Sequence, residues 1–186
     1  MPFTQVSIPG LLLFEPAVFA DSRGFFFESY NERIFAAQGI NDCFVQDNQS
    51  KSEYGVVRGL HYQLNPFAQT KLVRVLVGSI LDVAVDIRKN SPTYGQSFSI
   101  ELSAENKKQL YIPKGFAHGF SVLSETAEVL YKCDNFYSKQ SEGGILLSDA
   151  DLNIDWKIPA DKMIVSDKDK QNRRFADIEV NFEFSV

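Results

Sequence analysis

Side chains alternate between two faces along residues 71–88, and this pattern constrains the fold more than any other feature of the sequence. The first half of the segment places one alternate set on one face: Lys71, Val73, Val75 and Val77. After Gly78 and Ser79, a second alternate set is fully apolar: Leu81, Val83, Val85 and Ile87. A period of two residues is that of a β-strand, so the segment predicts two strands separated by a turn.

The opposite face of the second predicted strand carries three charged residues and an alanine: Asp82, Ala84, Asp86 and Arg88. Inside a closed β architecture, such a face lines a cavity. On the outside of a sheet, the same face is exposed to solvent. The pattern alone leaves both interpretations open.

Short turn signals divide the rest of the chain into brief runs: Pro9-Gly10, Asp21-Ser22-Arg23-Gly24, Gly78-Ser79, Ser91-Pro92, Pro113-Lys114-Gly115 and Gly143-Gly144. This spacing is typical of hairpins in a β-sandwich or barrel. The aromatic residues, 16 Phe, 7 Tyr and 1 Trp, favour strands over helices. One helix is predicted over residues 32–38, with Asn31 as its N-cap and Gly39 as its stop.

The size and charge of the chain narrow its class. Its 186 residues, 44% of them hydrophobic and 23% charged, predict one folded domain over residues 1–186. A net charge of -5 argues against a nucleic-acid or membrane-surface partner, so an anionic ligand would require a locally basic pocket. The cysteines, Cys43 and Cys133, are far apart and are expected to be buried free thiols. The N-terminus has no signal-peptide pattern, and a cytoplasmic location is expected.

The chain has only two histidines, and both lie in informative strings. His61 and Gln63 are two residues apart in GVVRGLHYQ, six residues separate Lys71 from Gly78, and PKGFAH ends at His118. This spacing resembles the two motifs of the cupin superfamily, in which three histidines and a glutamate bind a metal inside a double-stranded β-helix. The resemblance implies a mainly β fold, a jelly-roll or cupin barrel with a few short helices.

Two of the four cupin ligand positions hold another residue type. Gln63 stands where the second histidine would be, and Lys71 stands where the glutamate would be. An ammonium group repels a divalent cation, and two histidines alone make a weak site, so no metal is expected. A single strand histidine is more often structural, but a base beside a cation is what carbanion chemistry requires.

Nine longer strings carry a second resemblance: DSRGFFFESY (21–30), FVQDNQSKS (44–52), VRGLHYQ (57–63), KLVRVLVG (71–78), DVAVDIRKNSPTYGQ (82–96), LSAENKKQLYIPKGFAHGF (102–120), LYKCDNFYS (130–138), SEGGI (141–145) and SDKD (166–169). In this order they resemble the dTDP-4-dehydrorhamnose 3,5-epimerase family. The match runs from the N-terminal strand to about residue 170 and is weak over residues 152–165. Strings of this length are far more specific than the cupin spacing.

The resemblance implies a homodimeric, cofactor-independent isomerase of dTDP-L-rhamnose biosynthesis, and through it a link to lipopolysaccharide O-antigen. Its substrate would be dTDP-4-dehydro-6-deoxy-D-glucose, inverted at C3 and C5. An epimerase acting at C3 alone, or on a related dTDP-4-keto sugar, is the close alternative. A cupin that binds a sugar nucleotide without catalysis and a metal-dependent cupin oxygenase are the other classes. Gln63 and Lys71 argue against the oxygenase.

The resemblance also assigns roles to individual residues. His61 matches the family's base, and Asp169 matches the carboxylate that pairs with it. Lys71 matches the cation near O4, where negative charge develops. Tyr131 matches the proton donor, and Tyr137 in the same segment is the competing assignment.

A further set of positions matches residues that contact the nucleotide sugar: Arg23, Glu28, Gln46, Asp47, Asn48, Arg58, Lys71, His118, Glu142 and Lys168. In this family the N-terminal segment crosses a dimer, so Arg23 and Glu28 are expected to complete the neighbour's site. Asp82 lies near the family's site and is equally an ion-pair partner for Arg58 or Lys71.

Overall fold

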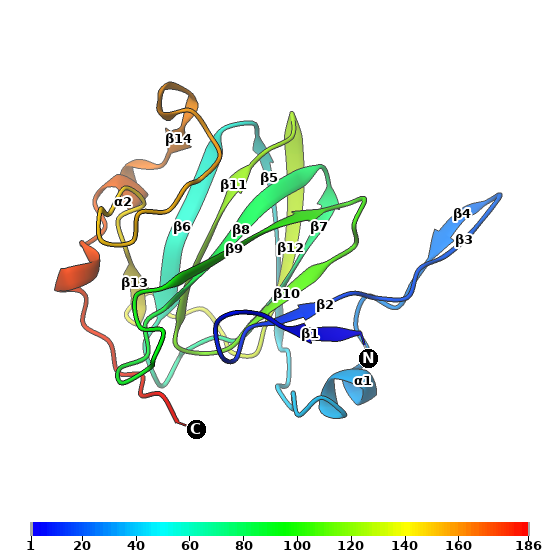
Figure 1. Cartoon of the computed structure of the whole chain (residues 1–186), viewed down its shortest axis with the longest axis horizontal. Coiled ribbons are helices and arrows are strands. Elements are labelled where there is room, and N and C mark those ends of the chain that lie inside the picture. Colours follow the sequence, from blue (N-terminus) through cyan, green and yellow to red (C-terminus); the bar gives the residue numbers. More distant parts are fainter. Residues whose placement is uncertain (1, 186) are drawn as a thin grey trace.

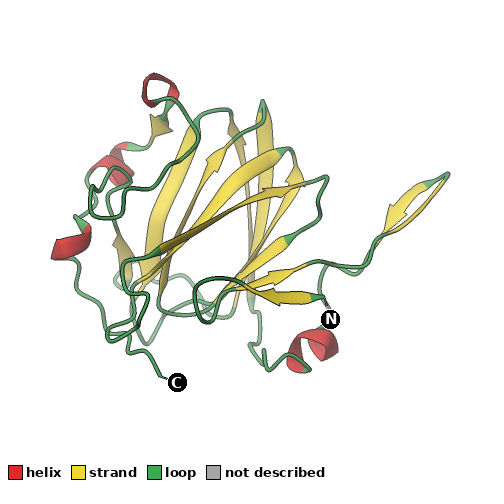
Figure 2. Cartoon of the chain, in the orientation of Figure 1, coloured by secondary structure: helices red, strands yellow, loops and turns green. Residues whose placement is uncertain are grey.

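Two antiparallel sheets dominate the computed structural model, which describes residues 2–185 (Figure 2). The first sheet has the strand order β1 (Phe3–Gln5), β2 (Leu12–Phe14), β10 (Gln109–Ile112), β7 (Lys71–Val77), β12 (Thr126–Cys133) and β5 (Gln46–Glu53). The second has the order β13 (Glu142–Gly144), β6 (Val56–Gln63), β11 (Phe116–Val122), β8 (Ser79–Asp86) and β9 (Ser97–Ser103). A short strand, β14 (Ile164–Val165), pairs in parallel with β6.

The chain crosses from one sheet to the other at most of its turns. It passes from β5 to β6, then to β7 and β8, changing sheet each time, and does so again along β9, β10, β11 and β12 (Figure 1). This is the double-stranded β-helix of a jelly-roll barrel, so the predicted fold class is confirmed. The hairpin expected at Gly78 is instead a corner between sheets, where φ is 74° and a Cβ atom would collide with the Thr126 carbonyl oxygen.

Helices are few and short, as predicted. α1 covers Glu32–Ala36, and the side chain of its N-cap, Asn31, accepts a hydrogen bond of 3.1 Å from the Arg33 amide. α2 covers Asp167–Lys170, and two 3₁₀ turns, η1 and η2, cover Ala160–Lys162 and Phe175–Asp177. Gly143 and Gly144 do not form the predicted turn. They belong to β13, where a Cβ on Gly143 would meet the Tyr62 ring.

The main hydrophobic core lies between the two sheets. Val73 and Val75 from β7 face Ile80 and Ala84 from β8 within it. Asp82 shares this inward face of β8 and is fully buried, which rules out the solvent-exposed interpretation for this residue. The apolar set over residues 81–87 packs on the other face of the second sheet, outside the barrel.

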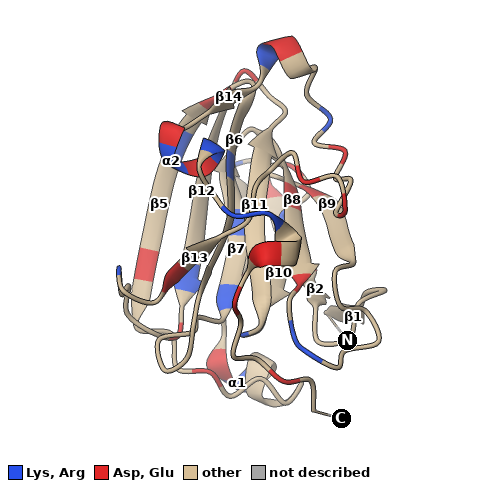
Figure 3. Ribbon diagram, turned by 90° about the vertical axis from the view of Figure 1, so that its left-hand side faces the viewer, with Lys and Arg blue, Asp and Glu red and all other residues tan. Residues whose placement is uncertain are grey.

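The C-terminal part of the chain covers that outer face. Trp156 is buried there, its Nε1 atom donates to the Leu147 carbonyl over 3.0 Å, and its own carbonyl accepts from the Ser121 hydroxyl over 2.7 Å. Beyond Trp156 the chain forms β14 beside β6 and then α2. Figure 3 views the barrel from this side, with the charged residues of α2 beside β14. The C-terminal segment therefore places α2 beside β6, the strand that carries His61.

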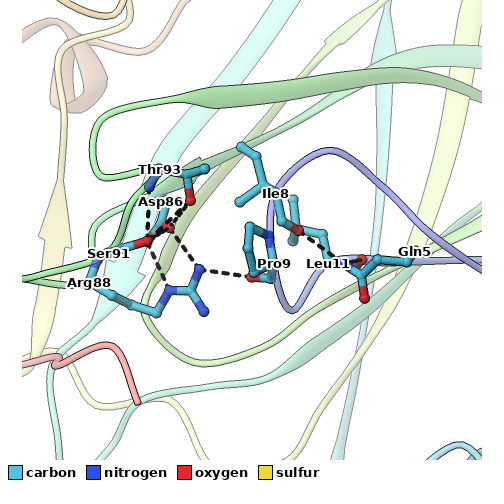
Figure 4. A network of polar contacts seen from close by, with 8 residues as sticks. All are labelled: Gln5, Ile8, Pro9, Leu11, Asp86, Arg88, Ser91 and Thr93. Atoms are coloured by element: carbon cyan, nitrogen blue, oxygen red, sulfur yellow. Dashed lines mark hydrogen bonds and ion pairs between the residues drawn. The ribbon is translucent and has the colours of Figure 1, made fainter. Parts of the chain in front are cut away.

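A buried polar network holds the C-terminal end of β8 (Figure 4). The Arg88 guanidinium donates to both carboxylate oxygens of Asp86 at 2.9 and 2.7 Å and to the Pro9 carbonyl at 2.8 Å. The Ser91 and Thr93 hydroxyls donate to Asp86 at 2.6 and 2.7 Å. The network thus ties the end of β8 to the loop between β1 and β2.

One hairpin projects away from the barrel: β3 (Phe19–Asp21) and β4 (Gly24–Phe26) (Figure 1). Phe19, Phe25 and Phe26 are 67%, 60% and 68% exposed on it.

Among residues 2–185, no helix is long and apolar enough to cross a membrane. Cys133 is buried as predicted, whereas Cys43 is exposed. The single domain over residues 1–186 stays a prediction.

Candidate active site

Two adjoining cavities open in the barrel beside β6 and β12. The larger cavity has a volume of about 580 Å³, and its wall includes Arg58, His118, Lys168 and Asp169. The smaller cavity has a volume of about 160 Å³, and its wall includes Gln46, Asn48, Tyr137 and Glu142. Three residues line both cavities: His61, Lys71 and Tyr131. These three, all predicted to be catalytic, therefore lie where the cavities meet.

His61 forms the predicted pair with Asp169. Its Nε2 atom lies 2.6 Å from Asp169 Oδ1, and the side chains are 33% and 5% exposed. Ser166 caps α2 by accepting a hydrogen bond of 3.1 Å from the Asp169 amide, which orients the carboxylate. Burial lowers the pKa of His61, although Asp169 acts in the opposite direction. The imidazole therefore stays neutral at physiological pH and is able to accept a proton.

Lys71 begins β7 and points into the cavities. Among residues 2–185, its ammonium group makes no hydrogen bond or ion pair; it lies 5.6 Å from the centre of the Tyr131 ring. Burial lowers the pKa of Lys71, while Cys133, Asp82 and Glu142 act in the opposite direction. This half-buried ammonium group makes no hydrogen bond and is available to stabilise a developing oxyanion.

Tyr131 and Tyr137 occupy different positions relative to His61. Tyr131 lies on β12, lines both cavities, and has a pKa raised by burial. Tyr137 is 56% exposed, lines only the smaller cavity, and donates its hydroxyl to Glu142 Oε2 over 3.1 Å. Tyr131 therefore lies with His61 where the two cavities meet, and Tyr137 does not.

His118 forms a second histidine–carboxylate pair. It is the direct cross-strand partner of His61, on β11 against β6, and its Nε2 atom lies 2.7 Å from Asp82 Oδ1. The expectation that Asp82 pairs with Arg58 or Lys71 is therefore wrong. Both residues of this second pair are buried, and the Asp82 Oδ2 atom has no hydrogen-bond partner among the described residues.

Two of the predicted nucleotide-sugar contacts, Arg58 and Lys168, line the larger cavity. The Arg58 Nε atom donates to the Ser52 hydroxyl over 3.1 Å, which orients the guanidinium. Lys168 Nζ lies 2.6 Å from Glu142 Oε1, and this contact raises the pKa of Lys168. Burial would raise the pKa of Glu142, but Lys168 and Tyr137 outweigh it and lower that pKa.

Three predicted contact residues lie outside the two cavities of this chain. Asp47 is on the outward face of β5, where it pairs with Lys132 at 3.1 Å. Arg23 is on the projecting hairpin and pairs with Asp21 at 2.6 Å. Glu28 accepts from Asn31 at 3.3 Å. Within one chain, therefore, the structure brings together the other predicted residues but not these three.

Several residues of the cavity walls were missed by the sequence reasoning, among them Ser50 and Gln69. Ser50 lines the larger cavity with a buried hydroxyl that has no partner among residues 2–185, and Gln69 lines the smaller cavity. The period of two along β5 was the available signal for Ser50, because Gln46 and Asn48 share its inward face. No comparable pattern marks Gln69, which lies in a loop.

The cupin metal site does not fit these residues. The Gln63 carboxamide is bonded to backbone groups of two loops. Lys71 stands at the sequence position of the acidic ligand, and its ammonium would repel a divalent cation. Among residues 2–185, no group of three His, Cys, Asp or Glu side chains is close enough together to hold a metal ion.

A jelly-roll barrel with a histidine, a lysine and a tyrosine gathered in an interior cavity is a cupin-type barrel with a candidate active site. The family model for dTDP-4-dehydrorhamnose 3,5-epimerase matches residues 5–177, and the chain belongs to this family. A Shigella flexneri protein named dTDP-4-dehydrorhamnose 3,5-epimerase is 57% identical over 178 residues, which are 95% of this chain and 97% of that protein.

Solved structures agree with this assignment. The dTDP-6-deoxy-D-glucose-3,5-epimerase of Legionella pneumophila Philadelphia 1, in complex with dTDP-4-keto-L-rhamnose, is 44% identical with a TM-score of 0.94, covering 99% of this chain and 98% of its own. A 3'-monoepimerase from Streptomyces bikiniensis, in complex with dTDP-quinovose, is 31% identical with a TM-score of 0.85, covering 92% of this chain and 86% of its own.

Proposed function

We propose that the chain inverts C3 and C5 of dTDP-4-dehydro-6-deoxy-D-glucose through an enolate, giving dTDP-4-dehydro-L-rhamnose. The observation that carries this proposal is the convergence of His61, Lys71 and Tyr131 where the two cavities meet. Epimerisation beside a ketone requires a base, a positive charge at the ketone oxygen, and an acid on the other face of the ring. These three residues supply one of each.

The first step is removal of a proton by His61. The C4 ketone acidifies the hydrogens on C3 and C5, and the neutral imidazole accepts one of them. Asp169 accepts a hydrogen bond from Nε2, which leaves Nδ1 as the basic atom and stabilises the imidazolium that forms. A buried carboxylate in contact with the imidazole makes this charge separation easier.

The second step is return of a proton to the opposite face. Lys71 stabilises the negative charge on O4 while the enolate exists. Tyr131 then donates its phenolic proton to the carbon, and its raised pKa ensures that the phenol is protonated at physiological pH. Tyr137 remains the competing acid. Its hydroxyl is already donated to Glu142, which supports a wall-forming role instead.

The nucleotide part of the substrate would be held by charge and hydrogen bonds. Arg58 and Lys168 in the wall of the larger cavity suit a diphosphate. Polar side chains of the smaller cavity and the barrel interior provide further contacts: Gln46, Asn48, Glu142 and His118. Asp47 faces outward in this chain and would reach a ligand only if its side chain or strand moved.

We propose further that the protein is a homodimer. The hairpin of β3 and β4 exposes three phenylalanines, and neither Arg23 nor Glu28 lines either of the two cavities of the candidate site. A second copy that received this hairpin would bury the aromatic rings and gain both side chains for its site. Sedimentation equilibrium should give twice the mass of the chain. We also propose that the protein is cytoplasmic and that its product is used in the synthesis of lipopolysaccharide O-antigen.

Inversion at C3 alone is the second candidate, because a 3'-monoepimerase shares the fold at 31% identity. The product distinguishes the two. Borohydride reduction at C4 followed by hydrolysis should release L-rhamnose and 6-deoxy-L-talose after double inversion. Single inversion at C3 would instead give 6-deoxy-D-allose and 6-deoxy-D-gulose. Recovery of only D-fucose and D-quinovose would contradict both candidates.

A further inference from the structure

Gln63 occupies a position where metal-binding cupins have a histidine, and its carboxamide is fully engaged with backbone groups. Its Nε2 atom donates to the Phe67 carbonyl over 2.6 Å and to the Phe136 carbonyl over 3.2 Å. Its Oε1 atom accepts from the Ser138 amide over 2.6 Å. Only one orientation of the amide fits two carbonyls and one N–H, and this orientation uses both of its donors.

Two of these three backbone partners belong to the residues on either side of Tyr137. The Tyr137 amide itself donates to Gln46 Oε1 over 3.2 Å. The backbone at Tyr137 is thus held from β5 and from β6 at the same time. Gln63 is only 6% exposed, so this attachment is made inside the protein and is protected from competing water.

The Tyr137 side chain has little support of its own. It is 56% exposed, and its hydroxyl makes one hydrogen bond, to Glu142. An exposed ring with few contacts takes its position from its backbone. The backbone of residues 136–138 therefore determines whether the ring stands in the wall of the smaller cavity. Gln63 makes two of the side-chain hydrogen bonds that hold this backbone, and Gln46 makes a third.

We propose that Gln63 is a positioning residue that holds Tyr137 in the wall of the sugar-nucleotide site. Gln63 lies on β6, the strand that also carries His61, and stands where other cupins have a metal ligand. Here it serves as a clamp that holds the loop after β12. Fixing the wall before the ligand arrives removes an ordering penalty from binding. The identity of the ligand rests on the proposed function. The hold of Gln63 on the backbone around Tyr137 does not depend on it.

The test replaces Gln63 by methionine, which is similar in length and makes no amide hydrogen bonds. The loop stays attached because Gln69 Nε2 still donates to the Asn135 carbonyl over 2.8 Å. Hydrogen exchange at the Ser138 amide should become at least about tenfold faster, and the dissociation constant for dTDP should rise about tenfold, the effect of losing one or two net hydrogen bonds. With substrate, KM should rise more than kcat falls.

Gln49→Met is the matched control. Gln49 is exposed on β5 and bonds to Glu128 at 3.0 Å, away from both cavities. It should leave exchange at Ser138 and the affinity for dTDP unchanged. Gln63→Glu is the second variant, because it retains the acceptor for the Ser138 amide and loses both donors. The carboxylate would also turn an oxygen towards the Phe67 and Phe136 carbonyls inside the protein, so an effect at least as large as that of Gln63→Met is expected.

A double-mutant cycle tests whether Gln63 acts through Tyr137. Tyr137→Ala should weaken dTDP binding, and Gln63→Met should then add less than about twofold. The proposal would be overturned if the two substitutions weakened dTDP binding independently, so that their fold-losses in affinity multiplied. A wild-type rate of hydrogen exchange at the Ser138 amide in Gln63→Met would overturn it as well. Exchange and dTDP affinity require no turnover. An enzyme that fails to epimerise the sugar would therefore contradict the proposed function while leaving this test intact.

Discussion

The Nε2 atom of His61 lies 2.6 Å from the Oδ1 atom of Asp169, although 108 positions separate the two residues in the chain. The contact exists because the C-terminal segment covers the outer face of the second sheet and returns along β6 through β14. A base assembled in this way has a definite pH dependence. The pKa of His61 lies below its usual value of about 6.5 because of burial.

The acidic limb of the kcat/KM profile should therefore lie below pH ~6.5 in the wild type. Asp169 opposes the effect of burial, so Asp169→Asn should move this limb to still lower pH. The same change should lower the plateau by about 10²-fold or more, since the imidazolium loses its carboxylate. Profiles of both proteins over pH 4–8 provide the measurement. A limb that moved to higher pH in Asp169→Asn would contradict the pairing.

Tyr131→Phe should lower epimerisation more than it lowers solvent exchange. The base can still remove a proton and return it on its own face, whereas delivery to the opposite face is lost. The two rates come from one incubation in D₂O, as product formed and as deuterium gained by the substrate. Tyr137→Phe should keep the wild-type ratio of these rates. The opposite pattern would make Tyr137 the acid.

Chelation should leave the enzyme fully active. The Lys71 ammonium supplies the positive charge that a bound cation would otherwise place near O4. Protein treated with EDTA should retain its kcat, and Lys71→Glu should be inactive without added metal. Elemental analysis for Zn, Mn, Fe and Ni accompanies the assay. Activity that vanished on chelation and returned with a divalent ion would contradict the role of Lys71.

Arg88→Met should destabilise the fold by about 3–5 kcal/mol, because it leaves the fully buried Asp86 carboxylate without its cation. Urea unfolding measures the change. The matched control is Lys157→Met, since Asp155 and Lys157 have the same spacing and form an exposed ion pair. That pair is open to solvent, and no measurable loss is expected.

The same network gives stability a pH dependence. Burial would raise the pKa of Asp86, but Arg88, Ser91 and Thr93 together outweigh it and lower that pKa. The unfolded carboxyl titrates near pH ~3.9, so this contribution to stability is present above that pH and is lost as the pH falls towards the folded pKa. Arg88→Met should lose less stability than the wild type between pH 5 and pH 3. If the stability of the two proteins fell in parallel over this pH range, the role assigned to Asp86 would be contradicted.

Local alternation predicted individual strands well. β7 has the predicted bounds, and Asp82 lies on the inward face of β8, as expected if that face is not exposed to solvent. The pattern did not reveal that the chain changes sheet at Gly78, because a period of two marks a strand but not its partner. The partner of Asp82 was missed for the same reason. His118 reaches it from β11, through a register that depends on contacts distant in sequence.

The candidate site was predicted from long matching strings more than from local physics. Asp169 in a run of charges would otherwise be assigned to a solvated loop, and only the folded C-terminal segment explains its burial. Alternation alone could have separated Asp47 from its neighbours, since Gln46 and Asn48 face inward on β5 and Asp47 faces outward. Gln63 drew attention as a lost metal ligand, but its clamp on the Tyr137 loop required coordinates.

Deuterium incorporation by His61→Asn tests the central claim most directly, because one base is proposed to serve both carbons. Purified protein is incubated with dTDP-4-dehydro-6-deoxy-D-glucose in D₂O, and NMR follows the signals at C3 and C5. The wild type should incorporate deuterium at both carbons. His61→Asn should lose exchange at both by about 10²-fold or more, the contribution of a general base. Wild-type exchange at either carbon in that variant would show that another residue removes the proton.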